Sequence, residues 1–500
     1  MKNFRKNKTF IIFILTIFLS ITSGPLFAGG NVDKTDEKIQ SSQNIEAKYV
    51  FLFIGDGMSM AQVNSAEIFA NSLSNQDIQI QKLNFTRFPV SGLTTTYDAS
   101  SFITDSASSA TAMASGNKTL SGVINMDTTK TVPFKLITEY ASDKGKKIGI
   151  ISTVSLDHAT PAAFYAKAAS RSDYYGIAKQ IVNSGFDYFA GGGFAQPKGK
   201  EKDQTDIITI LTDAGYTYVN SRENFDALKS GDEKIIAVNS FLQDSAAMPY
   251  DIDRSPDDLS LADYTRKGIE LLSKDPEGFF MMVESGKIDW ACHANDAGAS
   301  IRDLIAFDQA ISEALAFAKQ HPMETLIVVT GDHETGGMTI GFAGTKYTTS
   351  FNNIKAQKMS FTAFNTKILG PYKAATPKNK AKLADLLPGL KDAFGLDFES
   401  LTAFQKEQLE LAFQRSMGNE MVRAVEEDQY LLYGGYEPFT VKITQLANQN
   451  AGIGWTSYSH TGVPVATFAM GAGEELFAGY YDNTEIFQKL ADAMNISTAN

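Results

Sequence analysis

Carboxylates and imidazoles recur in this sequence where strongly apolar runs end. The chain has five histidines, and four of them stand near such a run or near glycine: His158, His293, His333 and His460. Acids occupy matching places at Asp56, Glu284, Asp289 and Asp332. Each residue taken singly could be an ordinary turn or surface residue. Carboxylate and imidazole ligands without thiolate suit zinc with an open coordination position, or magnesium and manganese, so the set predicts a metal site.

Ser106 is the candidate nucleophile, because it opens a predicted helix of small residues that ends near Gly116. A serine at this place often does no more than cap the helix. The same place also offers backbone N–H donors and the positive end of a helix dipole to a phosphate. No Gly-x-Ser-x-Gly sequence is present, which disfavours a serine hydrolase with a nucleophile elbow.

Short apolar runs typical of buried strands must position these groups. Strands are expected over Tyr49–Ile54, Lys147–Ser152, Phe279–Val283, Thr325–Thr330 and Val465–Ala469. Helical patterns lie between them, over Met58–Ala70, Tyr174–Asn183, Leu259–Ser273 and Ala297–Lys319. This alternation predicts an α/β fold with a largely parallel central sheet flanked by helices. The carboxyl ends of parallel strands share one edge of a sheet, where the acids and histidines would meet.

Composition limits the class of protein. A length of 500 residues allows one large domain with insertions, or two to three smaller domains. With 43% hydrophobic and 20% charged residues, the chain is neither disordered nor dependent on cross-links. Its single cysteine, Cys292, excludes an intrachain disulfide and a cysteine-rich metal site. The net charge of −12 disfavours nucleic acid as a sequence-specific partner.

Residues 1–28 have the order of a secretory signal peptide: a basic start, the apolar run Phe10–Leu19 and a plausible cleavage site after Ala28. The apolar run is shorter than the ~20 residues of a spanning helix, although a membrane anchor stays the alternative. Residues 29–46 are polar and are expected to form a flexible leader. The mature protein is therefore expected in the periplasm or secreted, without a stable membrane span.

Residues 340–455 break the alternation and are interpreted as an insertion into a core of residues 47–339 and 456–500. Nine lysines and a single acid lie between Lys346 and Lys391. Helices are expected there over Leu401–Met417 and Asn419–Leu432. Because the insertion lies between the candidate ligands His333 and His460, we expect a cap at the metal site that also contributes to a dimer interface. A peripheral subdomain is the alternative.

Six motifs together resemble those of the alkaline phosphatases. They occur in family order and span residues 47–495 apart from the insertion: FIGDGM at 53–58, TDSASSATAMASG at 104–116, HATPAAFYAKAASR at 158–171, VESGKIDWACHAND at 283–296, TGDHETGG at 330–337 and SHTGVPV at 459–465. The resemblance implies an alkaline-phosphatase-like fold and hydrolysis of small phosphate monoesters by a homodimer.

The resemblance also implies two zinc ions and one magnesium ion. One zinc would take Asp289, His293 and His460. The second would take Asp56, Asp332 and His333, and magnesium would share Asp56 and use Thr160 and Glu284. Ser106 would attack phosphorus to give a phosphoserine intermediate, and Arg171 would clamp the phosphate.

His158 and Trp290 depart from some bacterial members, which carry Asp and Lys at these positions, whereas other members carry His and Trp. Imidazole is a weaker magnesium ligand than carboxylate, so His158 and Trp290 are expected to contact substrate. A phosphodiesterase or phosphonate hydrolase on the same core is the alternative function. Diesterase relatives often use threonine as nucleophile and lack the magnesium group, so Ser106 with Thr160 and Glu284 favours monoesters.

Overall fold

The computed structural model describes residues 46–74, 78–418 and 427–498. The predicted signal peptide and all but the last residue of the predicted leader lie outside these ranges. The first part of the predicted helix Asn419–Leu432 also lies outside them, and its end falls in a helix that begins at Glu427. Within the described ranges, no helix combines the length and the apolar character needed to cross a membrane.

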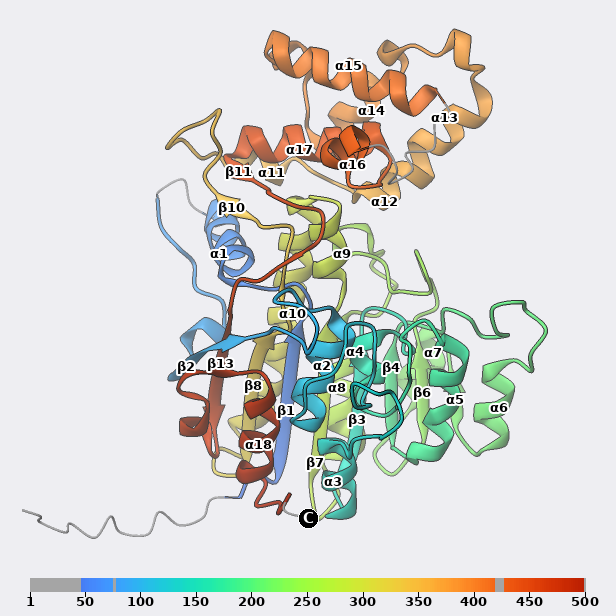
Figure 1. Cartoon of the computed structure of the whole chain (residues 1–500), viewed down its shortest axis with the longest axis vertical. Coiled ribbons are helices and arrows are strands. Elements are labelled where there is room, and N and C mark those ends of the chain that lie inside the picture. Colours follow the sequence, from blue (N-terminus) through green and yellow to red (C-terminus); the bar gives the residue numbers. More distant parts are fainter. Residues whose placement is uncertain (1–45, 75–77, 419–426, 499–500) are drawn as a thin grey trace, which may run out of the picture. The chain divides into compact units, whose positions relative to one another are not determined.

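A ten-stranded sheet forms the centre of the described chain, in the order β14-β2-β13-β8-β1-β7-β3-β4-β6-β5 (Figure 1). The strands of this sheet are β1 Tyr49–Gly55, β2 Val90–Thr95, β3 Lys147–Ser152, β4 Tyr188–Gly191, β5 Thr217–Val219, β6 Ile235–Val238, β7 Phe279–Ser285, β8 Thr325–Gly331, β13 Val465–Gly471 and β14 Gly479–Asp482. Strand β13 runs antiparallel to β8 and β2, and the other pairs are parallel. The predicted largely parallel α/β fold is confirmed, as are the five predicted strands.

Strand β1 shows why the sheet is covered on both faces. Tyr49, Phe51 and Phe53 point into a core with helices α1, α8 and α10. The alternate residues Val50, Leu52 and Ile54 join a second core with α2, α3, α5 and α18. The helices are α1 Met60–Ser74, α2 Ser106–Ser115, α3 Ile137–Asp143, α4 Ala159–Ala162, α5 Tyr174–Ser184, α6 Ile207–Asp213, α7 Arg222–Ala227, α8 Leu261–Leu272, α9 Lys287–His293, α10 Ala297–Ala318 and α18 Thr484–Ala493.

The segment between β8 and β13 carries short strands and a helical subdomain. Strands β9 Glu334–Thr335 and β10 Thr339–Ile340 pair with β12 His460–Thr461 and β11 Ile453–Gly454, respectively. Between β10 and β11 lie α11 Asn352–Lys355, α12 Phe361–Phe364, α13 Gly370–Ala375, α14 Leu383–Phe394, α15 Ala403–Met417, α16 Glu427–Tyr433 and α17 Pro438–Ala451. Helices α14, α15 and α17 bury a separate apolar core around Leu390, Phe413 and Phe439.

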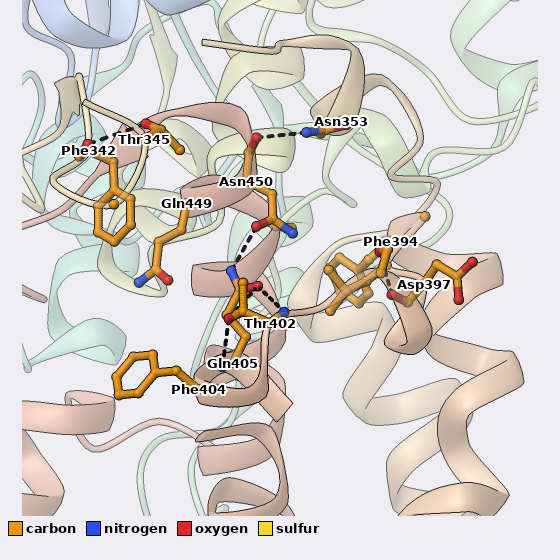
Figure 2. Close-up of a pocket in the computed structure, with 15 residues that line it drawn as sticks. Phe342, Thr345, Asn353, Phe394, Asp397, Thr402, Phe404, Gln405, Gln449 and Asn450 are labelled. Carbon is orange, nitrogen blue, oxygen red and sulfur yellow. Dashed lines mark hydrogen bonds between the residues drawn. The ribbon is translucent and has the colours of Figure 1, made fainter. Parts of the chain in front are cut away.

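This helical segment also holds a cavity of about 580 Å³, which none of the candidate site residues lines (Figure 2). Phe342, Phe404, Gln405 and Asn450 are among the residues that line it. The amide of Gln405 donates to Oδ1 of Asn450 at 2.8 Å, which joins α15 to α17. The ring of Phe404 is 68% exposed at this cavity.

We predict that Gly191→Ala lowers the free energy of unfolding by about 3 kcal/mol or more. Gly191 ends β4 with φ +118, and a Cβ atom there would lie 1.9 Å from the carbonyl oxygen of Ser152 on β3. Gly185→Ala is the matched control, because Gly185 also has a positive φ of +64 but has open space around a Cβ atom. Gly185→Ala should lower the free energy of unfolding by only about 1 kcal/mol. Urea unfolding measures both values, and equal losses would contradict the steric argument.

Candidate active site

Parallel pairing brings the carboxylates of three strands together. Gly55 at the end of β1 pairs with Ser285 of β7 and with Gly331 of β8. Asp56, Glu284 and Asp332 therefore meet at one edge of the sheet, and all three are fully buried. The turn after β1 needs the positive φ of Gly57, whose N–H donates to Oδ1 of Asp332 at 3.0 Å.

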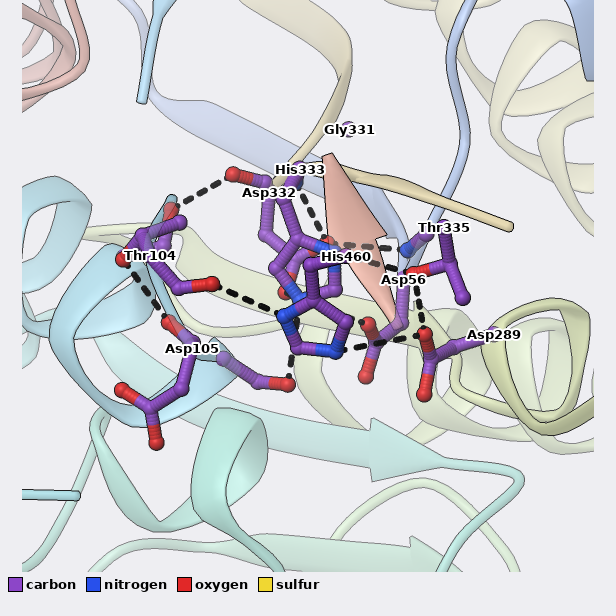
Figure 3. Close-up of polar contacts among 12 residues, drawn as sticks. Asp56, Thr104, Asp105, Asp289, Gly331, Asp332, His333, Thr335 and His460 are labelled. Atoms are coloured by element: carbon purple, nitrogen blue, oxygen red, sulfur yellow. Dashed lines mark hydrogen bonds and ion pairs between the residues drawn. The ribbon is translucent and has the colours of Figure 1, made fainter. Parts of the chain in front are cut away.

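Asp289, His293 and His460 form the first group of possible metal ligands, with their ligand atoms within 4.8 Å of one another. Asp289 lies 3.3 Å from Nε2 of His293 through Oδ2, and 3.7 Å from Nε2 of His460 through Oδ1. Backbone carbonyls contact the other ring nitrogens. The carbonyl oxygen of Tyr458 lies 2.5 Å from Nδ1 of His293, and that of Thr104 lies 2.8 Å from Nδ1 of His460. Figure 3 shows the ring of His460 between Thr104 and Asp289. The sequence predicted these same three residues as one zinc site.

A second group joins Asp56, Asp289 and His333, again within 4.8 Å. Asp332 lies beside it, with Oδ2 at 3.2 Å from Nε2 of His333 (Figure 3). The sequence assigned Asp56, Asp332 and His333 to one ion, and the structure adds Asp289 as a neighbour of both groups. Among the described residues, neither oxygen of Asp56 has a hydrogen-bond partner, and Oδ2 of Asp332 also has none.

The third group contains Asp56, Glu284 and His158. The hydroxyl of Ser152 donates to Oε2 of Glu284, whereas Oε1 has no partner within the described part of the chain. The buried hydroxyl of Thr160 and Nδ1 of His158 likewise find none there. Buried polar atoms are rarely left without a partner, so these oxygens fit a cation that prefers oxygen ligands. His158, expected beside substrate, thus also lies within reach of this group.

Burial and crowding raise the pKa values of the acids. Burial, then the neighbouring Asp332, raises the pKa of Asp56 well above its usual range. Burial raises the pKa of Asp332 to about 8 and that of Glu284 to about 7. For Asp289 burial acts in the same direction, but the three nearby histidines hold its pKa below the usual range. Asp289 in turn raises the pKa of His293 to about 9, against the effect of burial. Bound cations would relieve the repulsion among these acids.

Ser106 lies at the start of α2 and faces these groups. The side chain of Asp105 caps the helix by accepting from the N–H of Ser108 at 3.0 Å. That cap leaves the hydroxyl of Ser106 free to point to Nε2 of His333, at 3.2 Å. A serine at the first position of a helix, not at the cap, keeps its side chain available for chemistry.

Arg171 reaches the same place from the loop after α4. Its Nη1 donates to Oδ2 of Asp105 at 2.8 Å, and its Nη2 lies 3.2 Å from Nε2 of His158. Burial, then the positive charge of Arg171, lowers the pKa of His158 to about 3, so this imidazole is neutral and accepts from the guanidinium. The ring of His158 packs edge-on against Trp290, with centroids 5.8 Å apart.

Ser106, His158, Arg171 and Trp290 line one cavity of about 380 Å³. Six further lining residues were not predicted from the sequence: Asp244, Ser245, Tyr250, Phe361, Thr362 and Tyr436. Three of them, Phe361, Thr362 and Tyr436, come from the helical segment between β10 and β11. No motif marked them, because aromatic residues and hydroxyls at isolated positions are usual in any core or surface.

Lys287 is a second unpredicted feature, because it is a fully buried cation beside this cavity. It forms an ion pair with Asp244, and its Nζ lies 3.7 Å from the ring centroid of Tyr250 and 4.8 Å from that of Trp290. Burial lowers the pKa of Lys287, although Asp244 opposes the shift. The pair and its cation–π contacts hold two rings of the cavity wall.

The fold is a largely parallel α/β sheet flanked by helices, and carboxylates, imidazoles and a serine cluster at the edge of the sheet where proteins of this class carry their active sites. The family model described as alkaline phosphatase matches residues 47–496, and the chain belongs to this family. It is 31% identical to alkaline phosphatase 3 of Bacillus subtilis (strain 168), with 96% of each chain covered. These findings make the protein a phosphatase and confirm the resemblance seen in the motifs.

Solved structures agree with this assignment. The cold-active alkaline phosphatase of the psychrophile Shewanella sp. superposes with a TM-score of 0.74 at 29% identity, covering 89% of this chain and 99% of that one. A variant of the alkaline phosphatase from the Antarctic bacterium TAB5, with Mg bound in its M3 site, gives a TM-score of 0.61 at 26% identity, covering 91% and 99%. The predicted alkaline-phosphatase-like fold is therefore confirmed.

We predict that Asp244→Asn lowers the free energy of unfolding by about 3 kcal/mol, because it leaves the fully buried Lys287 without its charged partner. The double variant Lys287→Met/Asp244→Asn is the control and should recover most of the loss. Urea unfolding of the wild-type protein, both single variants and the double variant gives the coupling energy. Strictly additive losses would contradict the ion pair as the source of the effect.

Proposed function

We propose that this phosphatase hydrolyses phosphate monoesters to an alcohol and inorganic phosphate through a phosphoserine on Ser106. The observation that carries the proposal is the position of the Ser106 hydroxyl, 3.2 Å from Nε2 of His333 and in one cavity with Arg171. The hydroxyl lies at a helix N-terminus, next to the groups that could hold cations. Such a place suits phosphoryl transfer, which depends on positioning and on charge stabilisation.

We also propose two zinc ions and one magnesium ion as cofactors. Asp289, His293 and His460 would hold one zinc, and Asp56, Asp332 and His333 the other. Asp56, Thr160 and Glu284 would hold magnesium. The oxygens of Asp56, Asp332, Glu284 and Thr160 that lack a hydrogen-bond partner among the described residues support this arrangement. When bound, such ions stabilise an alkoxide nucleophile and the charge on the transferring phosphoryl group.

The chain's own residues divide the reaction between them. The oxygen of Ser106 bonds to phosphorus as the bond from phosphorus to the alcohol oxygen breaks, and the alcohol leaves. Arg171 binds two phosphoryl oxygens with its planar guanidinium, while Asp105 and His158 fix its orientation. Water then attacks the phosphoserine, which restores the Ser106 hydroxyl and releases phosphate. His158 and Trp290 line the side of this cavity where the substrate would lie.

A phosphodiesterase or phosphonate hydrolase remains the alternative, and the rates on a nitrophenyl monoester and on the matching diester distinguish it. The presence of serine at position 106, with Thr160 and Glu284 grouped near Asp56, supports the monoesterase.

We also propose, from the sequence, how the chain is organised and where it acts. Residues 1–28 would be a signal peptide, residues 47–339 and 456–500 the core, and residues 340–455 a cap. The protein would be a homodimer that is exported to the periplasm or the medium. The three cavity residues of the inserted segment, Phe361, Thr362 and Tyr436, support the cap.

We predict that Ser106→Ala lowers kcat on a phosphate monoester by about 10³-fold or more, because the attacking oxygen is removed. The variant should fold and still bind metal, since the ligand side chains remain. Ser115→Ala is the control, as Ser115 lies at the other end of α2 and donates to the carbonyl of Thr111. Trapping labelled phosphate at low pH on the wild-type protein identifies the acceptor, and label on a residue other than Ser106 would refute the assignment.

We predict that removal of metal by a chelator abolishes activity and lowers Tm by about 5 °C or more, since ions that bind the folded state stabilise it by mass action. Re-addition of zinc and magnesium should restore both. Asp56→Asn should show a smaller change in Tm on chelation, because one shared ligand charge is gone. Calorimetry after verified metal removal tests this, and an unchanged Tm would count against the shared metal site.

A further inference from the structure

A small aromatic cluster joins the sheet domain to the helical segment. Tyr250 and Trp290 come from the sheet domain, and Phe361 and Tyr436 come from the segment between β10 and β11. The ring of Phe361 packs against Tyr250 at 5.8 Å and against Tyr436 at 6.0 Å between centroids. Tyr250 is fully buried and Phe361 is 9% exposed, whereas Trp290 and Tyr436 are half-buried.

All four rings also line the cavity that contains Ser106 and Arg171. The phosphate of a bound ester would lie beside Ser106 and Arg171, under the proposed function. The alcohol portion of the ester must then extend toward the rings. A cavity of about 380 Å³ holds a phosphate and a ring-sized group, since ligand pockets begin at roughly 300 Å³.

The wall at the alcohol end offers four aromatic faces beside the hydroxyls of Ser245 and Thr362, and no unpaired charge among the residues that the structure describes there. Asp244 is the acid on this wall, and it is paired with Lys287 and accepts from the hydroxyl of Thr362 at 3.4 Å. A charged alcohol would gain no partner on such a wall. A planar apolar ring would gain offset or edge-on contacts with Trp290 and Tyr436.

We propose that these four rings form the leaving-group subsite and select phosphate monoesters of aromatic alcohols over those of small aliphatic polyols. The inference rests on the proposed monoesterase function and adds the class of alcohol. Lys287 is a positioning residue in this subsite, because it lies between the rings of Tyr250 and Trp290 without lining the cavity itself. Selectivity therefore depends on a wall built jointly by the sheet domain and the helical segment.

Tyr436→Ala tests the subsite, because Tyr436 is half-buried and lies in the helical segment, outside the sheet domain. The measured quantity is kcat/KM for naphthyl phosphate divided by kcat/KM for glycerol 2-phosphate. Differences in the intrinsic reactivity of the two alcohols cancel when the variant's ratio is compared with that of the wild-type protein. We expect the ratio to fall by about tenfold, with unchanged inhibition by inorganic phosphate, since the phosphate end of the cavity is untouched.

Two control variants accompany this measurement. Tyr436→Phe keeps the ring and should keep the ratio. Phe404→Ala removes an exposed ring of the same helical segment at the separate cavity shown in Figure 2, and it should also keep the ratio. A ratio unchanged by Tyr436→Ala would overturn the subsite. So would an equal loss on both esters with weaker inhibition by phosphate, which indicates a structural role.

Failure of the proposed function gives a different result from failure of the subsite. A wild-type protein that releases phosphate from neither ester would overturn the monoesterase, and the subsite with it. Turnover of both esters by the wild-type protein, with a ratio that Tyr436→Ala leaves unchanged, would overturn only the subsite.

Discussion

The burial of several acids at one edge of the sheet is the constraint on which the rest of the structure depends. Parallel register places Gly55, Ser285 and Gly331 side by side. Asp56, Glu284 and Asp332 are adjacent to these residues in sequence, so they must lie close together. Ionised carboxylates without partners are costly to bury, and burial accordingly raises the pKa of each of the three. The protein can keep them ionised only where positive charge reaches them, and the clustered oxygens of these acids would receive it from bound cations.

Rigid strands make this crowding possible. Strand β1 is buried on both faces and sends alternate residues into two separate cores, so the position of Asp56 is fixed by packing on either side. Helix α2 approaches from one of these cores, and its N-terminus brings Ser106 to the edge. The site is thus held by elements whose stability comes from apolar burial.

The sequence predicted the elements that are long and buried. Strands β1, β3, β7, β8 and β13 stand out as apolar runs, and the acids that follow them marked the site. Strand β2 was missed because its pattern is half exposed, and β5 because it has three residues. Asp289 as a neighbour of two ligand groups was also missed. Its role depends on how α9 folds back beside His333, which spacing along the chain does not determine. Tyr250, Phe361 and Tyr436 meet only through tertiary packing.

The proposed metal sites and the proposed leaving-group subsite share a structural element. Helix α9 carries Asp289 and His293 toward the proposed metal sites, Trp290 toward the cavity and Lys287 behind the wall. Just after it, Asp296 caps α10 and accepts from Gln357 at 2.7 Å and from the N–H of Phe361 at 2.9 Å. The inserted segment is therefore anchored three residues beyond the proposed metal ligand His293. A change in the position of α9 would move the proposed ligands and the aromatic wall together. Substitutions that alter selectivity through Trp290 or Lys287 should therefore also alter metal affinity. Tyr436 lies on the other side of the wall, in the helical segment, so its substitution should alter selectivity without altering metal affinity.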